Sequence, residues 1–202
     1  MSARSARFTI LLALFLVTPA VAQERQPPIT HTAIIETSKG TISMELYGKD
    51  APRTVANFVA LARNGFYNGL LIHRVVPGFV IQMGDQLTRD SSMRERWGTG
   101  GMSSYDGKPF EDELDETTPS YERGYVEGAL AMANRGPNTN SSQFFIMLED
   151  RDDMPHKYTI FGRVTRGMDV VHTISKAEAN KKGVPAEDIQ VRSVTVAEAA
   201  GQ

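Results

Sequence analysis

The sequence predicts a mainly β fold, a closed β-barrel whose open ends are covered by helices. Three observations predict this fold class. Many short apolar runs are separated by turn-forming residues, only two segments have the period of an amphipathic helix, and the 202 residues contain neither an internal repeat nor an interdomain linker. We assign residues 31–198 to one barrel domain and residues 199–202 to a short tail.

The strand-like runs follow one another along the domain. The first two, Ala33–Thr37 and Thr41–Tyr47, are joined by a short turn that contains glycine, which is typical of a hairpin. In the second run Ile42, Met44 and Leu46 alternate with polar residues, so one face of this strand is expected to be buried. The further runs are 70–82, which is broken at Pro77-Gly78, 129–133, 144–148, 158–164 and 189–196.

Two segments have the period of a helix. Between Pro52 and Gly65 apolar residues recur three and four positions apart, and Pro and Gly are start and stop signals for a helix. A second apolar stripe of this kind lies in 168–176. Between Gly84 and Gly107 the chain is rich in Gly, Ser and Asp, which predicts a long surface loop.

The N-terminus has the layout of a secretory signal peptide, which we assign to residues 1–22. Arg4 and Arg7 precede an apolar run of 10 residues, and small residues end the segment. Spanning a bilayer takes roughly 20 apolar residues, so a signal anchor is the weaker interpretation, and we expect no stable membrane insertion after cleavage. Residues 23–30, with two adjacent prolines, are expected to form a flexible leader.

Composition excludes several classes of function. Removing residues 1–22 leaves 180 residues with 20 basic and 24 acidic side chains, a net charge of −4, and no basic block that would attract nucleic acid. The absence of Cys excludes disulfides, thiol nucleophiles and zinc–thiolate sites. The four histidines lack the spacing of metal ligands, and we expect neither a metal nor a cofactor.

The most informative run is 71–85. On a strand, Arg74 and Val76 share one face, and after the Pro77-Gly78 break Val80 and Gln82 share a face as well. An Arg between apolar runs needs partners for its five donors, and the Gln82 amide oxygen is an acceptor nearby. From this pattern alone, an arginine whose head reaches solvent is the stronger interpretation. His73 is expected to be a packed structural residue.

Further motifs extend the pattern, and together they resemble the cyclophilins, a family of peptidyl-prolyl cis-trans isomerases. They occur in family order over nearly all of residues 31–197. The motifs are His73-Arg74 to Asp85, Thr99-Gly100-Gly101, Phe110 to Glu113, Met132-Ala133-Asn134 with Gly136 to Asn140, Ser142 to Ile146, and Phe161 to Val164.

The resemblance implies an eight-stranded antiparallel barrel with a helix at each end, and it implies a role for individual residues. Arg74 becomes the catalytic arginine and Gln82 the side chain that orients it. Asn134 is expected to bind the substrate mainly through its main chain. The implied substrate-binding residues are Phe79, Val80, Phe145, Met154 and Tyr158 around the proline, and Ala133, Asn134 and Gln143 along the peptide backbone.

The sequence departs from the family pattern at several positions. Val80 stands where Met is common and Tyr158 where His is common, but both keep an apolar body. Asp153 falls where the pocket edge often carries an aromatic residue, so binding of cyclosporin-like ligands is expected to be weakened. The 86–98 connection is longer than in compact relatives and contains the only Trp. We hypothesise that Trp97 packs on the barrel while the neighbouring arginines extend the substrate groove.

The resulting functional prediction is a monomeric enzyme that isomerises X-Pro bonds in unfolded or flexible polypeptides. No nucleophile, metal or cofactor is required, because a fixed cationic donor beside the prolyl nitrogen favours the twisted amide. The alternative is a non-catalytic proline-binding or holdase chaperone module that uses the same groove. The signal peptide predicts a periplasmic or secreted location, where the protein would assist the folding of exported proteins.

Overall fold

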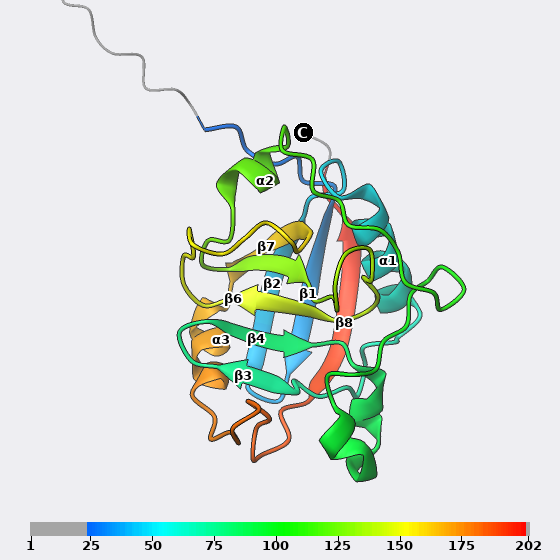
Figure 1. Cartoon of the computed structure of the whole chain (residues 1–202), viewed down its shortest axis with the longest axis vertical. Coiled ribbons are helices and arrows are strands. Elements are labelled where there is room, and N and C mark those ends of the chain that lie inside the picture. The colour runs from blue at the N-terminus through cyan, green and yellow to red at the C-terminus, as the bar shows by residue number, and fades with distance from the viewer. Residues whose placement is uncertain (1–23, 201–202) are drawn as a thin grey trace, which may run out of the picture.

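An eight-stranded antiparallel sheet forms the centre of the protein (Figure 1). The computed structural model describes residues 24–200, so the predicted signal peptide at 1–22 lies outside the described residues. The strands are β1 (His31–Thr37), β2 (Gly40–Leu46), β3 (Arg74–Val76), β4 (Val80–Met83), β5 (Ala129–Met132), β6 (Phe144–Met147), β7 (Ile160–Arg166) and β8 (Val191–Glu198).

The strands are arranged in the order β3-β4-β6-β5-β7-β2-β1-β8. β1 and β2 form the predicted hairpin, in which Ile35 pairs with Ile42 and places two β-branched side chains on the buried face. β1 also pairs with β8, which comes last of the eight strands. The mainly β fold class and the eight antiparallel strands are confirmed.

The prediction of a closed barrel is only partly correct, because the sheet curls into a half-barrel whose edge strands β3 and β8 do not pair. The segments that precede these strands meet instead. Leu71 forms an isolated bridge with Gln190, and the Ile72 amide donates to the Ile189 carbonyl at 2.9 Å. β3 is only three residues long, and its Val75 amide donates to the Gly183 carbonyl at 2.7 Å. A loop therefore occupies the edge that a closing strand would need.

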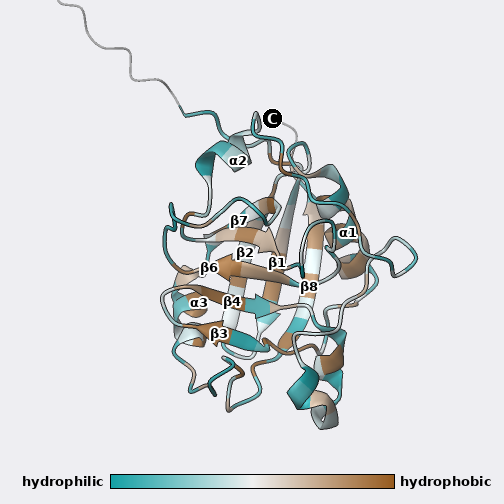
Figure 2. Cartoon of the chain, viewed as in Figure 1, coloured by the Kyte–Doolittle hydropathy of each residue, from teal (hydrophilic) through white to brown (hydrophobic). Residues whose placement is uncertain are grey.

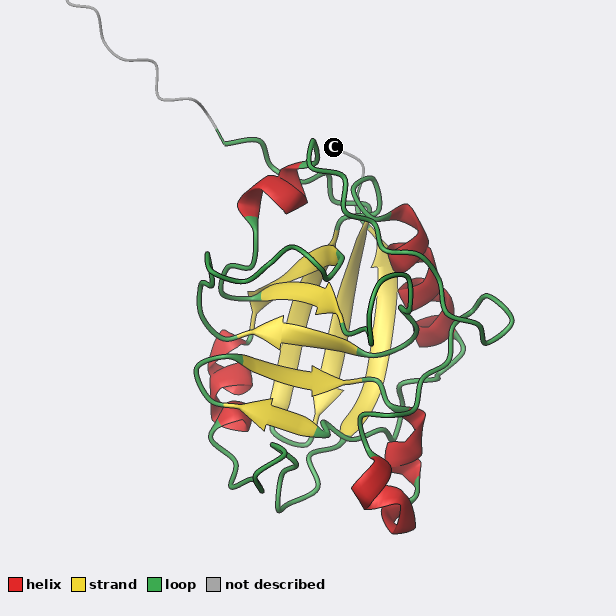
Figure 3. Cartoon of the chain, viewed as in Figure 1, coloured by secondary structure: helices red, strands yellow, loops and turns green. Residues whose placement is uncertain are grey.

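Both predicted helices are present, as α1 (Pro52–Arg63) and α3 (Met168–Ser175) (Figure 3). Glu113, far along the chain, accepts hydrogen bonds from the Arg53 and Thr54 amides at 2.9 Å each, so it satisfies two donors at the start of α1. A third helix, α2 (Pro119–Arg123), was not predicted, because five residues are too few for a periodic apolar stripe. No helix within residues 24–200 is long and apolar enough to cross a membrane.

The sheet separates two hydrophobic clusters, and Figure 2 shows hydrophobic residues concentrated on its strands. Along β6 the side chains alternate: Phe144 and Ile146 enter the main core, while Phe145 and Met147 enter the second cluster. In the main core Phe58 lies edge to face with Phe144 at a centroid distance of 5.5 Å. The second cluster lies under the surface where most of the predicted site residues are found.

The 86–98 connection is folded rather than open. It contains two short 3₁₀ helices, Gln86–Arg89 and Ser91–Arg96. Asp85 secures both its ends, because its carboxylate accepts hydrogen bonds from the amides of Leu87, Gly98 and Gly100.

The hypothesis for this connection is wrong for its arginines, and its tryptophan is buried within the connection. Trp97 is 9% exposed and donates from Nε1 to the Leu87 carbonyl at 3.1 Å, so it is buried against the connection itself, and its packing on the barrel stays a prediction. Arg94 lies over the Trp97 ring and pairs with Asp188 at 3.0 Å. Neither Arg94 nor Arg96 lines the hollows of the groove described below, because Asp188 and the indole ring hold Arg94 on another face.

The segment that precedes β1 lies along α2. Arg123 donates to the Glu24 carboxylate at 3.0 Å and to the Gln26 side chain at 2.8 Å, and Arg25 pairs with Glu122 at 2.6 Å. These contacts hold residues 24–26 against one end of the half-barrel.

Candidate active site

Arg74 and Gln82 lie opposite each other on the antiparallel strands β3 and β4. Their side chains project from the face of the sheet that carries the second cluster, since the neighbours Val75 and Ile81 enter the main core. The Arg74 Nη1 donates to the Gln82 Oε1 at 3.3 Å. The predicted pairing of the two side chains is therefore present, and the half-buried guanidinium has a fixed partner.

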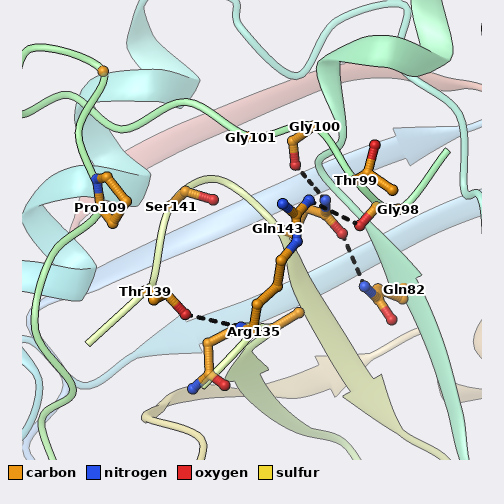
Figure 4. A pocket seen from close by; sticks show the side chains of 13 residues that line it. Gln82, Gly98, Thr99, Gly100, Gly101, Pro109, Arg135, Thr139, Ser141 and Gln143 are labelled. Atoms are coloured by element: carbon orange, nitrogen blue, oxygen red, sulfur yellow. Dashed lines mark hydrogen bonds between the residues drawn. The ribbon is translucent and has the colours of Figure 1, made fainter. Parts of the chain in front are cut away.

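A relay of amides sets the orientation of Gln82. The Gln143 Nε2 donates to the Gly100 carbonyl, which leaves the Gln143 Oε1 to accept a hydrogen bond from the Gln82 Nε2 at 2.9 Å. Because that nitrogen is used as a donor, the Gln82 Oε1 faces Arg74. Figure 4 shows the links from Gln82 through Gln143 to Gly100. Gln143 thus acts on Arg74 through Gln82.

A glycine from a distant loop packs against the stem of Arg74. A Cβ atom on Gly183 would lie 2.8 Å from the Val75 carbonyl oxygen, closer than these atoms approach in proteins, and 3.2 Å from the Arg74 Cγ, which is a tight contact. Its φ of +82° also favours glycine. The sequence carried no signal for this contact, because Gly183 lies far from Arg74 along the chain and in no recognised motif.

Beside Arg74 the surface forms a pocket of about 200 Å³. Its floor belongs to the second hydrophobic cluster, and Phe145 meets Tyr158 edge to face at a centroid distance of 5.5 Å. Nine of the ten predicted site residues line this pocket: Arg74, Phe79, Val80, Gln82, Ala133, Asn134, Phe145, Met154 and Tyr158. The tenth, Gln143, lines an adjoining hollow of about 260 Å³ that shares Gln82, Ala133 and Asn134 with the pocket (Figure 4).

Asn134 presents its main chain to the pocket. Its side-chain Nδ2 donates to the Lys157 carbonyl at 2.9 Å, which turns the amide group into the protein. The main-chain N and O of Asn134 have no hydrogen-bond partner within residues 24–200. This geometry suits the expected main-chain contact with a peptide, which stays a prediction.

The outer wall of the pocket is the loop 151–158, and both its ends are held by Tyr125. The Arg151 amide donates to the Tyr125 carbonyl at 2.9 Å. The Tyr125 hydroxyl donates to the Tyr158 carbonyl at 2.9 Å and accepts from the Tyr158 amide at 3.0 Å. Burial raises the pKa of Tyr125, which keeps this hydroxyl protonated as a donor. Sequence reasoning missed Tyr125, because no motif includes it.

A second missed feature is the guanidinium of Arg151, which lies 5.3 Å from the centroid of the Phe79 ring. Asp153 holds it there through two hydrogen bonds, at 2.9 and 3.2 Å. The close spacing of Arg151 and Asp153 was a visible signal for an ion pair, but the sequence did not show which ring the pair would cover.

His73 lies behind Arg74 and is 2% exposed, as expected for a packed structural residue. Neither of its ring nitrogens has a hydrogen-bond partner within residues 24–200. Burial lowers the pKa of His73 to about 4, against a smaller raising effect of Asp85, so the ring is neutral near pH 7. A neutral ring adds no positive charge beside Arg74.

A pocket with an apolar floor beside a fixed guanidinium, on an eight-stranded antiparallel half-barrel, is the arrangement that the family resemblance implied. Residues 32–196 match the family described as cyclophilin-type peptidyl-prolyl cis-trans isomerase. The chain belongs to this family and carries its isomerase domain, and the family resemblance seen in the sequence is confirmed.

Relatives and solved structures agree with this assignment. The chain is 43% identical to the mouse peptidyl-prolyl cis-trans isomerase-like 1 over 166 residues, 82% of this chain and 90% of that protein. It is 41% identical over 179 residues to the peptidyl-prolyl cis-trans isomerase cyp15 of Rhizopus delemar, covering 89% of this chain but only 26% of that longer relative. It therefore spans about a quarter of several long relatives.

The fold also matches that of a solved cyclophilin-type isomerase from Cryptosporidium parvum. The TM-score is 0.74 at 30% sequence identity, covering 85% of this chain and 99% of the other. A structure of that same protein in the presence of the dipeptide Ala-Pro gives a TM-score of 0.72.

Proposed function

We propose that the chain catalyses cis–trans isomerisation of X-Pro peptide bonds, with Arg74 as the donor that stabilises the twisted amide. The observation that carries the proposal is the Arg74 guanidinium, which Gln82 holds at 3.3 Å beside a pocket with an apolar floor. A module that only bound proline would need the pocket but would gain nothing from a fixed cationic donor. Family membership supports the same conclusion.

The chemistry follows from the electronic structure of the X-Pro bond. Partial double-bond character makes its rotation slow, on the order of tens to hundreds of seconds without a catalyst. Rotation breaks the resonance and leaves a lone pair on the prolyl nitrogen. A guanidinium directed at that nitrogen binds the twisted state more strongly than either planar isomer, which is the condition for catalysis.

The pocket supplies the fixed point for this rotation. Phe79, Val80, Phe145, Met154 and Tyr158 would hold the proline ring, and its burial contributes about 1–2 kcal/mol. Ala133, Asn134 and Gln143 would hold the peptide backbone. With the ring held, the preceding carbonyl can turn past Arg74 while the rest of the substrate stays in place.

The test is the rate of cis–trans exchange in a short X-Pro peptide, measured by NMR or by coupled proteolysis. For Arg74→Ala we expect kcat to fall by about 10²–10³, as when an active site loses one directed donor. Arg74→Lys keeps the charge but loses the planar fork, so partial activity is expected. Arg192→Ala, which removes an exposed arginine from β8, is the matched control.

Two results would decide against an enzyme. Equal slow exchange with wild type and Arg74→Ala would remove the catalytic role of Arg74. Saturable binding of the peptide without faster exchange would favour the alternative, a proline-binding or holdase module.

We also propose that the enzyme works as a monomer on flexible, proline-containing segments of exported proteins, in the periplasm or outside the cell. The support is the arrangement of residues 1–22, in which basic residues, an apolar run and small residues follow one another. After expression in a Gram-negative host, sequencing of the mature N-terminus should begin at Gln23, and sedimentation should give one chain. An intact Met1 in the cytoplasmic fraction would contradict the exported location.

For cyclosporin-like ligands we propose weak binding, because Asp153, at the position where the resemblance implies an aromatic pocket edge, is an exposed carboxylate that pairs with Arg151. Calorimetric titration should give an affinity at least about tenfold higher for Asp153→Trp than for wild type, since a buried indole edge adds on the order of 1.5 kcal/mol. Equal affinities would show that this position does not limit the binding.

A further inference from the structure

A second, larger hollow lies on the other side of one wall of the proline pocket. Its volume is about 460 Å³, compared with about 200 Å³ for the pocket, and the two share Asn134 and Tyr158. We call it the Lys157 hollow, after the charged residue at its rim. Its other walls include Leu114, Pro137 and His156.

In the shared wall, hydrogen bonds hold the side chain of Asn134, while its main-chain groups stay available to a ligand. The Asn134 side chain donates to the Lys157 carbonyl at 2.9 Å and to the Asp112 Oδ1 at 3.3 Å. The main-chain N and O of Asn134 lack partners in the described part of the chain. A polypeptide whose proline fills the pocket and whose backbone bonds to Asn134 passes over this wall, so a neighbouring side chain reaches the Lys157 hollow.

The walls of the hollow are mainly apolar. Leu114, Pro137 and the ring of Tyr158 supply apolar surface, and the His156 ring is held against Tyr121 at a centroid distance of 4.0 Å. The one carboxylate in the wall, Asp112, is saturated by hydrogen bonds from Asn134 and Asn140 and from the Asn138 amide. Such a surface favours a large apolar side chain.

The charge at the rim is positive. The Lys157 ammonium makes no hydrogen bond or ion pair with residues 24–200. Arg135, which also lines the hollow, directs its guanidinium to the Gly98 carbonyl at 3.4 Å on the Gln143 side (Figure 4). Lys157 is therefore the cation left to pair with a carboxylate of a bound chain.

We propose that the Lys157 hollow is a second substrate subsite, which takes a large apolar side chain flanking the proline while Lys157 pairs with an adjacent acidic residue. This inference rests on the proposed isomerase function. Such a subsite would favour proline-containing segments in which an aromatic or aliphatic residue and a carboxylate lie on the same side of the proline.

The test uses an alanine-rich X-Pro host peptide in which each position flanking the Ala-Pro pair is replaced in turn by Phe, Glu or Lys. At the positions that reach the hollow we expect KM to fall about fivefold for Phe, from burial of part of the ring, and about threefold for Glu. Lys at the same positions should raise KM. The Glu effect should weaken with added salt.

Two variants separate the two contacts. Lys157→Glu should reverse the order of the Glu and Lys peptides and keep the Phe effect, whereas Leu114→Asn should reduce the Phe effect and keep the charge effect. Lys181→Glu, an equal charge change on an exposed loop residue away from the hollow, is the matched control and should leave all ratios unchanged.

Each outcome decides the proposal separately from the isomerase function. If the host peptide is turned over but KM is the same for the Phe, Glu and Lys peptides, the subsite is absent while the isomerase function stands. If Lys181→Glu changes the ratios as much as Lys157→Glu does, the charge effect comes from the whole surface and the subsite is also ruled out. No turnover of any peptide by the wild type would contradict the isomerase function itself.

Discussion

At the scale of single residues, the position of Arg74 depends on a chain of side-chain hydrogen bonds. Gln82 reaches the guanidinium at 3.3 Å, Gln143 reaches Gln82 at 2.9 Å, and the Gly100 carbonyl ends the relay. Of these contacts, the sequence predicted only the pair Arg74 and Gln82, because the family resemblance implies that Gln82 orients Arg74. The contact with Gly100 joins segments distant in the chain and could not be derived in that way.

The relay gives a prediction for Gln143. In Gln143→Leu the Gln82 amide loses the partner that sets its orientation, so it is free to turn its nitrogen toward Arg74. We expect kcat/KM for an X-Pro peptide to fall about tenfold, the cost of one lost directed hydrogen bond of about 1.4 kcal/mol. Gln190→Leu, at an exposed position, serves as the control. An unchanged kcat/KM in Gln143→Leu would mean that Gln82 is held by other contacts.

The buried His73 predicts how stability depends on pH. Its pKa is lowered to about 4 in the folded protein, below an unfolded value of 6.5, so between these pH values the unfolded chain binds more protons. Folding stability should therefore fall as pH falls from 6.5 to 4, by about 3 kcal/mol from this group.

The measurement is urea unfolding at several pH values for wild type and His73→Gln. The variant has no imidazole to protonate, so its stability should fall less over this range. Parallel curves for the two proteins would show that His73 does not take up a proton on unfolding.

At the scale of elements, the loop 151–158 forms the outer wall of the pocket and depends on Tyr125. Tyr125→Phe keeps the ring and removes the hydroxyl that bonds to both the amide and the carbonyl of Tyr158. We expect the free energy of unfolding to fall by about 1–2 kcal/mol. KM for an X-Pro peptide should rise severalfold with a smaller change in kcat, because Arg74 stays in place.

The control is Tyr105→Phe, which removes a hydroxyl that donates to the Arg53 carbonyl at 2.9 Å and belongs to no pocket residue. A similar loss of stability without a change in KM is expected there. If both variants changed KM equally, the effect of Tyr125 would be general destabilisation.

The connection 86–98 gives the opposite kind of prediction. Arg94 contacts Trp97 and Asp188 and lines neither the proline pocket nor the adjoining Gln143 hollow. Arg94→Ala should lower the free energy of unfolding by about 1 kcal/mol or less and leave peptide kinetics unchanged, since the contacts are partly exposed. A changed substrate preference, measured over a set of X-Pro peptides, would restore the hypothesis that this arginine extends the groove.

Elements differ in how far their sequence predicts them. The helix 52–63 and the hairpin 31–46 are long enough for their apolar period to be visible, and both occur as expected. α2 has five residues and no stripe, and its position depends on distant partners, among them Asp50, whose carboxylate accepts the Ser120 amide at 2.9 Å. Tertiary contacts of this kind leave no local pattern.

At the scale of the whole molecule, the family motifs predicted eight antiparallel strands, and what they did not predict was how the sheet ends. Strand pairing can be inferred from motifs, but closure depends on the length of the edge strands and on what lies beside them. β3 is only three residues long, and its Val75 amide donates to the Gly183 carbonyl, so this donor is not available to a closing strand. The half-barrel therefore joins its edges through the segments that precede β3 and β8, by the bridge between Leu71 and Gln190 and the hydrogen bond from the Ile72 amide to the Ile189 carbonyl.

The pairing of β1 with β8 has a consequence for how the protein assembles. Ile35 lies opposite Val194, so β1 gains its second neighbour only when a segment far along the chain has arrived. Up to that moment the hairpin of β1 and β2 has an open edge and a half-covered core. Contacts of such long range slow folding, because the loop between the two segments must close before they form. A chain passing through a narrow channel would therefore stay unfolded until nearly all of the domain, including β8, had emerged on the far side.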